Sequence, residues 1–427
     1  MLRLKGLAPV QWLLSLPLLL MGWASLQGWR AERPLLVALA GLACGLAGVA
    51  LVAGPATWLK LRLDARRVRT GGDDLCGQLQ HSWHTLGRCL RGWAGLMLVS
   101  LVLLLLYQLS WCWIHRHDGG WPALVFCLPL LSMLVAGAGL MKRLGQRWRT
   151  LEAPGTALLG VPLSRASAPA VWAWVERLAA RSGAPVPDHL VAGVDQCFFV
   201  TCVQVTLEPS GHLLQGRTLY LPLTFLSALS QEEAAAIIGH ELGHFSRRDS
   251  ERGSEAGARL SQMSAHYQAL AREGEPAGWF ERPVLWMAGS FLHHFHLAAQ
   301  HCRREQELLA DRAGAAMAGE AMFGQALLRV IVLGERIDVL LGTPGREDLM
   351  QALTEDLRRT PLSFNHQVLG RTVAHPFDTH PPTRDRLRQL GVTLDAELLA
   401  QATRAPTDRD RTWFGELVGA REHEQRL

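Results

Sequence analysis

The sequence is poor in charged residues, which make up only 19% of the 427 residues, whereas apolar residues make up 49%. The shortage is concentrated in residues 1–150, which are rich in Leu and Trp and contain long uncharged runs. The rest has the composition of an ordinary soluble domain. The net charge is only +5, so no nucleic-acid partner is expected. This composition predicts a membrane-embedded part followed by a soluble domain.

The sequence also lacks any Cys-x-x-Cys pair. Its eight cysteines are scattered along the chain, many of them in or beside the hydrophobic runs. A secreted domain held together by disulfides would show a different spacing. We therefore expect reduced thiols, as in a domain that faces the cytosol.

Four hydrophobic runs predict transmembrane helices, because each is close to the roughly 20 residues that cross the hydrocarbon core. Tryptophans cluster near the ends of these runs, as expected of interfacial anchors. The runs cover residues 7–28, 34–59, 93–114 and 121–140. An alternative for the first run is a cleaved signal peptide over residues 1–28, but no small-x-small cleavage site precedes a polar segment.

Basic residues flank the runs on alternate sides. They precede the first run, fill the connection between the second and third (Lys60 to Arg91), and follow the fourth (Lys142 to Arg149). The other two connections hold few. The positive-inside rule therefore predicts a multi-pass membrane protein with both termini and the soluble domain in the cytoplasm.

The soluble part shows a mixed pattern of helices and strands. Residues 171–181 predict a short amphipathic helix, and residues 189–207 and 218–221 predict strands. Ser230 with Glu233 forms a capping box that starts a helix, which we expect to end near Arg248. The predicted fold is a mainly α membrane protein: four N-terminal transmembrane helices, then an α+β domain with a small β-sheet.

The sequence His240-Glu241-Leu242-Gly243-His244 is the most informative motif in the chain. Residues four apart lie on one face of a helix, so the two imidazoles can bind a single zinc ion. Glu241 projects about 100° away and is available to move protons. Gly243 costs about 1 kcal/mol in a helix, so either close packing requires it or it is a neutral filler. The motif predicts a zinc peptidase, and therefore a zincin-like fold for the α+β domain.

Zinc needs a third protein ligand and an open position for water. Glu307 and Asp311 are four apart on a second predicted helix. Glu307 is the candidate ligand, and Asp311 is the candidate partner for the free ring N–H of His240 or His244. Glu305 is an alternative ligand, and a solvated charged face is the alternative for the whole segment.

Three motifs resemble the membrane zinc metallopeptidases that include HtpX and the CAAX prenyl-protein proteases. They are His240 to His244, Glu307 with Ala310-Asp311, and Thr379-His380-Pro381-Pro382 with Arg386, and they occur in the family order between about residues 165 and 395. The resemblance implies that Glu307, rather than Glu305, is the third ligand of one Zn²⁺ per chain.

The chain departs from the family pattern in three places. Gln306 stands where the family usually has Arg, and Gln196-Cys197-Phe198 replaces an Asn-Ala-Phe sequence. In addition, four predicted spans precede the zinc helix, where the usual layout has two before it and two after it. Substrate preference therefore transfers less well than zinc chemistry.

The predicted activity is zinc-dependent endopeptidase cleavage of protein substrates, either misfolded or membrane proteins. Zinc would lower the pKa of a bound water, and Glu241 would take its proton and pass it to the leaving amine. His380 and Arg386 are candidate donors to the oxyanion, or alternatively residues that only brace the domain. The alternative function is a zinc-binding membrane scaffold or sensor that cleaves nothing.

The predicted domains are a transmembrane domain (1–149), a metallopeptidase domain (150–400) and a polar C-terminal tail (401–427). Residues 196–206 are interpreted either as an edge strand that pairs with an extended substrate or as a core strand. Residues 279–297 are expected to pack on the core or lie at the membrane surface, with a fifth span as the alternative.

Overall fold

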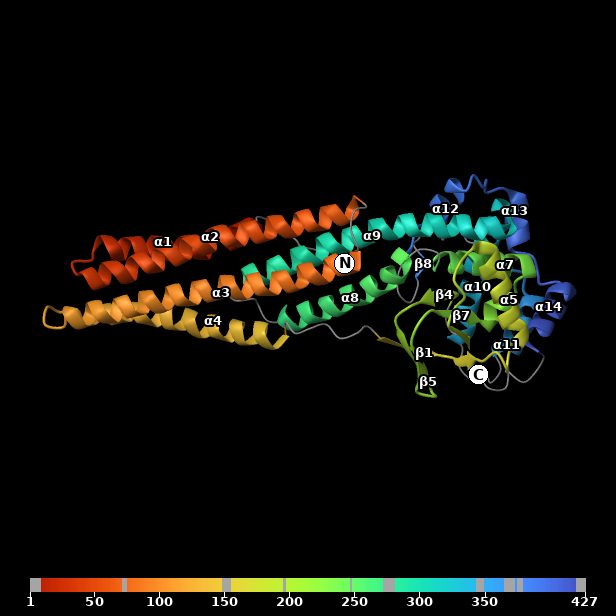
Figure 1. Cartoon of the computed structure of the whole chain (residues 1–427), viewed down its shortest axis with the longest axis horizontal. Helices are drawn as coiled ribbons and strands as arrows, with labels where there is room; N and C mark the ends of the chain where they lie inside the picture. Colours follow the sequence, from red (N-terminus) through yellow and green to blue (C-terminus); the bar gives the residue numbers. More distant parts are fainter. Residues whose placement is uncertain are drawn as a thin grey trace. The chain divides into compact units, whose positions relative to one another are not determined.

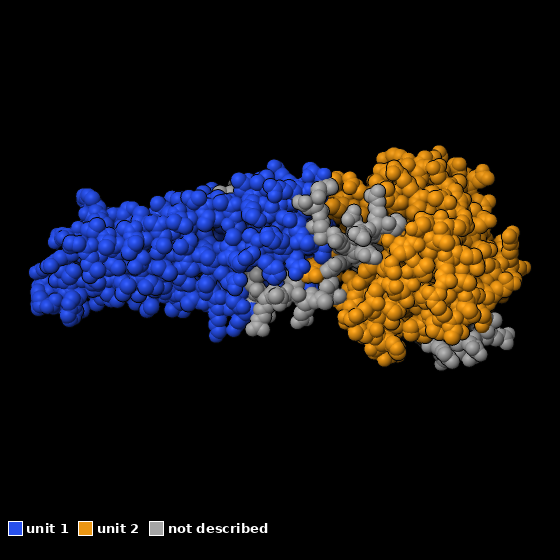
Figure 2. Space-filling model, viewed as in Figure 1, with its two compact units in different colours: residues 1–152, 260–298 blue, residues 153–259, 299–427 orange. Residues whose placement is uncertain are grey.

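The structure is a computed structural model of the chain. It describes residues 9–70, 75–147, 155–194, 197–245, 248–271, 281–342, 349–364, 373–374 and 379–419. Two compact units are present, and each combines two segments of the chain: residues 1–152 with 260–298, and residues 153–259 with 299–427 (Figure 2). These units are defined by compactness and not by function. The division into a transmembrane domain, a metallopeptidase domain and a tail, at residues 149 and 400, therefore stays a prediction.

Long helices form the first unit (Figure 1). The second of these helices begins at Pro34. Proline is tolerated at this first helical position because the N–H that it lacks would have no intrahelical acceptor. The helices of this unit are α1 (Pro9–Trp29), α2 (Pro34–Arg69), α3 (Leu75–Ile114), the 3₁₀ helix η1 (Trp121–Phe126), α4 (Cys127–Arg147), and the parts of α8 (Arg248–Ala271) and α9 (Arg282–Ala318) within residues 260–298.

Three helices of the described chain are long and apolar enough to cross a membrane, namely Pro34–Arg69, Leu75–Ile114 and Trp121–Gln146. They coincide with three of the four predicted spans. At the first predicted run, residues 7–28, lies α1, of which the part Leu13–Trp29 is a shorter apolar helix. The number of four spans is therefore not confirmed.

Helices α2 and α3 continue well beyond the apolar runs. Residues 60–69 and 75–92, predicted as a connection, are helical. A buried carboxylate ties the two extensions together: Asp64 accepts hydrogen bonds from Lys60 Nζ at 2.9 Å and from Ser82 Oγ at 3.3 Å. These polar contacts and the apolar groups between the helices explain why the helical hairpin persists outside the hydrophobic segments.

The N-terminal half of α9 covers most of the segment predicted to pack or lie at the membrane surface. Its Phe291 is buried 5.5 Å from the Trp83 ring of α3, and Ser290 accepts a hydrogen bond from Trp58 Nε1 of α2 at 3.1 Å. These contacts favour packing against the helices. By length and composition α9 forms a possible span only together with α10 (Glu320–Leu341), and the pair is bent by 113° at Gly319.

The second unit contains two small sheets where one was predicted. The first sheet has the order β1-β5-β6, and the second has the order β2-β3-β7-β4, with β3 and β7 parallel and β4 antiparallel at an edge. The strands are β1 (Gly155–Leu159), β2 (Val161–Leu163), β3 (His189–Gly193), β4 (Phe199–Thr201), β5 (Gln204–Glu208), β6 (His212–Leu214) and β7 (Thr218–Pro222). A separate pair joins β8 (Val373–Ala374) to β9 (Thr379–His380).

Helices pack on the second sheet and enclose the main core. Alternate strand residues such as Leu190 and Leu219 meet Trp174, Ile238 and Leu333 from the helices. The helices of this unit are α5 (Pro169–Ser182), α6 (Leu223–Leu226), α7 (Gln231–Gly243), the N-terminal half of α8, the C-terminal half of α9, α10, α11 (Leu349–Arg359), α12 (Thr383–Gln389), α13 (Ala396–Ala402) and α14 (Asp408–Val418).

Helix α7 begins as predicted. Ser230 Oγ accepts a hydrogen bond from the Glu233 N–H at 3.2 Å, and Glu233 Oε2 accepts one from the Ser230 N–H at 2.7 Å. The helix ends at Gly243 rather than near Arg248, and His244 is its C-cap in helical geometry. It has 13 residues and lies within the core, so a transmembrane zinc helix is excluded for this segment.

A buried charge network fixes the N-terminus of α7. Arg329 of α10 is completely buried and lies 3.5 Å from Glu233 Oε2. It also donates to the carbonyls of Ala228, Ala402 and Arg404, at 2.8 to 3.2 Å. One cation therefore joins α7, α10 and the chain after α13, which includes part of the predicted polar tail.

Replacing Arg329 with Met is expected to lower the unfolding temperature of the purified protein by about 10 °C. Removal of one partner of a buried pair costs about 3–5 kcal/mol, because Glu233 would lose one of its two cations and the buried carbonyls of Ala228 and Ala402 would lose their donor. The matched control is Arg336→Met on the same helix, where the half-buried pair with Asp356 contributes at most about 1 kcal/mol. Equal shifts for both variants in a thermal melt would contradict this account.

Candidate metal centre

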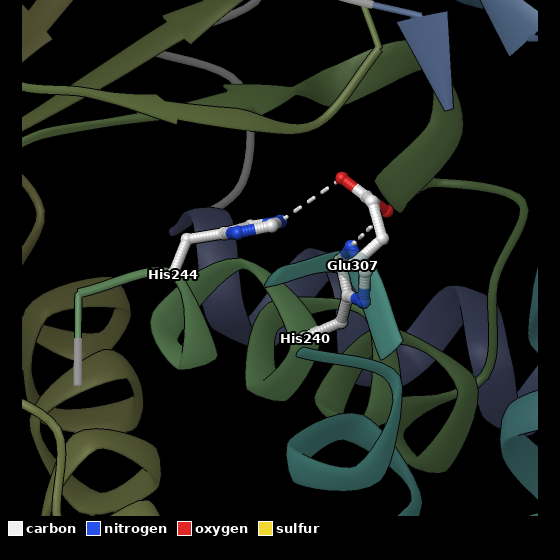
Figure 3. Close-up of side chains that lie close together, drawn as sticks. All are labelled: His240, His244 and Glu307. Atoms are coloured by element: carbon white, nitrogen blue, oxygen red, sulfur yellow. Dashed lines mark ion pairs between the residues drawn. The ribbon is translucent and has the colours of Figure 1, made fainter. Parts of the chain in front are cut away.

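Three side chains with metal-binding atoms converge at one point in the second unit (Figure 3). His240 and His244 come from the C-terminal end of α7, and Glu307 comes from α9. Their ligand atoms all lie within 4.8 Å of one another. Glu307 Oε2 is 3.7 Å from His240 Nε2, and Glu307 Oε1 is 3.5 Å from His244 Nε2.

These separations fit a shared zinc ion better than direct hydrogen bonds. An N–H···O hydrogen bond spans about 2.7–3.2 Å. Zinc bonds of about 2.0–2.2 Å at tetrahedral angles place neighbouring ligand atoms about 3.4 Å apart. Two imidazoles and one carboxylate also form a donor set that catalytic zinc uses, with one position left open. The three residues therefore fit zinc, although their role as ligands stays a prediction.

A buried acid–base pair orients the first imidazole. Asp311, one turn after Glu307 on α9, lies 3.0 Å from His240 Nδ1, so the opposite ring nitrogen points toward Glu307. Arg386 of α12 donates to Asp311 from Nη2 at 2.5 Å and from Nε at 3.0 Å. The geometry predicted for Asp311 is therefore present, and Arg386 contacts the same carboxylate.

The charges around this pair determine the protonation of Asp311. Burial alone would raise the pKa of its carboxyl, but the charge of Arg386 and the hydrogen bond with His240 lower that pKa to about 2. Burial would lower the pKa of Arg386, and the charge of Asp311 reverses this and raises it. The two groups are therefore ionised at neutral pH, and Asp311 accepts the Nδ1–H of His240.

Glu241 is buried beside the three candidate ligands, with only 4% of its surface exposed. Burial raises the pKa of its carboxyl well above the ordinary value, and the nearby carboxylate of Glu307 raises it further. A raised pKa is the property that a carboxylate needs to accept a proton from water and release it again near neutral pH. The site thus contains a group suited to proton transfer.

Close contact between α7 and α9 brings the ligands together. A Cβ atom on Gly243 would lie 2.8 Å from the Cβ of Ala313 and 3.2 Å from the Cα of Ala310. A Cβ on Gly314 would lie 2.9 Å from the carbonyl oxygen of Ala236. Of the two explanations for Gly243, the structure therefore favours close packing over a neutral filler.

The substitution Gly243→Ala is expected to destabilise the protein by up to about 2 kcal/mol and to reduce its zinc content. Alanine improves helix propensity by about 1 kcal/mol, but overpacking against α9 costs about 1–3 kcal/mol. The control is Gly415→Ala in α14, where a Cβ would meet nothing within 4 Å. That variant should be slightly more stable. Stabilisation of both variants in thermal melts would refute close packing at Gly243.

The rival ligand Glu305 lies elsewhere. Its side chain is 68% exposed and faces His301, at 3.9 Å. His380 is in β9, but its side chain is outside the described residues, so its predicted role is not tested.

The spacing of residues in the sequence did not indicate a role for Phe323, whose ring stacks on that of His240 with centroids 5.8 Å apart. Phe323 belongs to α10, and only the folded arrangement places it there.

Both interpretations of residues 196–206 apply to the described part of that segment. Among the strands that the structure describes, β4 pairs with β7 at the edge of the sheet, and it contacts α7. Phe198 and Phe199 are nevertheless buried in the core.

Burial, together with the charge of Glu241, raises the pKa of the neighbouring Cys197 thiol to about 12, which makes this thiol a poor metal ligand at neutral pH. The eight cysteines form no disulfide bond with one another in the described chain.

The comparisons with a family model and with individual proteins agree with one another. Residues 206–393 match Peptidase family M48. A protease HtpX homolog from Pelotomaculum thermopropionicum is 26% identical over 240 residues, which cover 54% of this chain and 77% of the relative. A homolog from Kineococcus radiotolerans is 23% identical over 286 residues, which cover 64% of this chain and 89% of the relative. No solved structure matches the chain.

The matched region contains the candidate ligands, Glu241, Asp311 and Arg386. The family implies metalloprotease activity and a polypeptide substrate, and the three apolar helices indicate a membrane protein. The chain is therefore a relative of the HtpX proteases and of the membrane zinc metallopeptidases of Peptidase family M48, as its three motifs indicated.

Proposed function

We propose that this protein is a membrane-anchored zinc endopeptidase that uses His240, His244 and Glu307 as metal ligands. The observation that supports this most is the convergence of three ligand atoms from two helices at separations suited to zinc. The buried carboxylate of Glu241 beside them supplies the proton acceptor that hydrolysis requires. The family match supports the same activity.

In the proposed mechanism, each protein group has a distinct task. A bound zinc ion would supply a water of lowered pKa and polarise the scissile carbonyl. The buried Glu241 carboxylate would accept a proton from the attacking water and deliver it to the leaving amine. Asp311 holds the Nδ1–H of His240, and Arg386 keeps Asp311 ionised and in place.

The contact with Asp311 supports a positioning role for Arg386 more than a role as oxyanion donor. Its Nη2 lies 2.5 Å from Asp311 Oδ1 but 3.9 Å from Glu307 Oε2. Two of its donors are therefore already directed at Asp311. His380 remains our candidate for the oxyanion donor on sequence grounds.

We further propose that an extended polypeptide pairs with β4, which lies at the edge of its sheet among the described strands. The strand pairs with β7 and contacts the helix that carries the two histidines. Addition of a strand reads the substrate backbone more than its side chains, which suits misfolded proteins and membrane proteins of varied sequence. The alternating basic flanks of the apolar runs support a cytoplasmic catalytic domain at a bacterial inner membrane.

The test is to purify the full chain in detergent, measure bound zinc, and follow cleavage of an unfolded protein before and after metal removal. Chelation should abolish cleavage, and stoichiometric zinc should restore it. One zinc per chain without cleavage of any of several unfolded substrates would favour the scaffold or sensor instead. Cleavage that survives complete removal of the metal would disprove the proposal.

A further inference from the structure

The extension of α3 that precedes its apolar segment carries a stripe of cationic and titratable side chains. His81, His84, Arg88 and Arg91 follow one another at intervals of three and four residues, so they share one face of the helix. With Gly77 and Gln80 they line a hollow of about 560 Å³ on this helix. His81, Arg88 and Arg91 are exposed.

This face has no acidic counterpart on its own helix, because residues 75–114 contain neither Asp nor Glu. In the neighbouring helix α2 the sole carboxylate is Asp64, which is buried and bonded to Lys60 and Ser82. Ser82 lies on the buried side of α3 together with Trp83 and Leu86. The negative charge of Asp64 is therefore directed into the helix pair and away from the stripe.

The position of the two arginines along α3 matches the depth of lipid headgroups. The apolar segment begins at Trp93, and with a rise of 1.5 Å per residue Arg91 and Arg88 lie about 3 Å and about 8 Å before it along the axis. The headgroup layer on each side of a bilayer is about 5–8 Å thick. Arginine is well suited to phosphate because its guanidinium offers several donors in one plane.

From this placement we propose that Arg88 and Arg91 bind the phosphate of an anionic phospholipid. The part of the hollow beside these two arginines accommodates the headgroup. The acyl chains then lie along the apolar segment that follows Trp93. This inference is independent of the proposed catalytic function, since none of these residues belongs to the metal centre.

The experiment uses the full chain in an uncharged detergent and counts bound lipid by native mass spectrometry during titration with phosphatidylglycerol or phosphatidylcholine. We expect tighter binding of phosphatidylglycerol. The double variant Arg88→Gln with Arg91→Gln should bind it about 25-fold more weakly, because each guanidinium at an anionic surface contributes about a fivefold factor. The matched control is Arg66→Gln with Arg69→Gln, two exposed arginines of α2 outside the hollow, which should change binding by less than about twofold.

Equal weakening in both double variants would overturn the proposal, because it would show that only diffuse surface charge attracts the lipid. Equal affinity for the two lipids would also overturn it, as would inorganic phosphate that competes as strongly as the lipid. If the Arg88 and Arg91 variant does not fold, a photoactivatable phosphatidylglycerol bound to the unaltered protein provides the test. Its crosslinks should fall on residues 77–95, and an even distribution over all helices would contradict the assignment.

Discussion

Replacing Glu241 with Gln is expected to reduce peptide cleavage by about 10²–10⁴-fold while zinc content stays at one ion per chain. Glutamine has nearly the same shape as glutamate but cannot accept a proton from water. The side chain is buried, and its raised pKa reflects burial and the proximity of Glu307. The effect should therefore appear in kcat, with little change in KM for the unfolded substrate.

The measurement combines metal analysis, a thermal melt and steady-state cleavage for both forms. The matched control is Glu232→Gln, an exposed carboxylate on the same helix, which should retain full activity. If Glu241→Gln cleaves as fast as the unaltered protein, Glu241 is not the general base. Loss of zinc in this variant would instead show that its carboxylate helps to hold the metal.

Replacing Glu307 with Ala should weaken zinc binding by more than about 100-fold and abolish cleavage. The estimate follows from the 10–100-fold loss typical when only an outer partner of a metal ligand is removed, since loss of a ligand itself costs more. Glu307 is buried, and its two oxygens lie 3.7 Å from His240 Nε2 and 3.5 Å from His244 Nε2. Two imidazoles alone would leave the metal with too few protein ligands.

The neighbouring Glu305→Ala variant is the matched control, because both changes remove one carboxylate from the same helix. Glu305 is mostly exposed and faces His301, so its loss should leave zinc affinity within about twofold. Competition with a fluorescent zinc chelator measures both affinities. A larger loss of affinity in Glu305→Ala than in Glu307→Ala would reverse the ligand assignment.

Local patterns in the sequence predicted those features that depend on helix periodicity and capping. The Ser230–Glu233 capping box forms, and the four-residue spacings of His240 with His244 and of Glu307 with Asp311 place each pair on one face of a helix. A spacing of four is informative because helical geometry fixes the relative directions of the two side chains. These features needed no knowledge of the tertiary fold.

Features that depend on contacts between distant segments were not accessible in the same way. The bond between Arg386 and Asp311 joins residues 75 positions apart, so no local pattern encodes it. The helical extensions of α2 and α3 beyond the apolar runs depend on packing and on the buried Asp64. The early end of α7 and the second small sheet follow likewise from tertiary packing, which overrides local propensity.

The most direct test of the metal centre is zinc X-ray absorption spectroscopy on the purified full chain. We predict one zinc per chain with two imidazole ligands, further oxygen ligands at about 2.0–2.2 Å and no sulfur. Glu307→Ala should lose this signal, and Glu241→Gln should keep it unchanged. A sulfur ligand at about 2.3 Å, or a spectrum with fewer than two imidazoles, would contradict a site built from His240, His244 and Glu307.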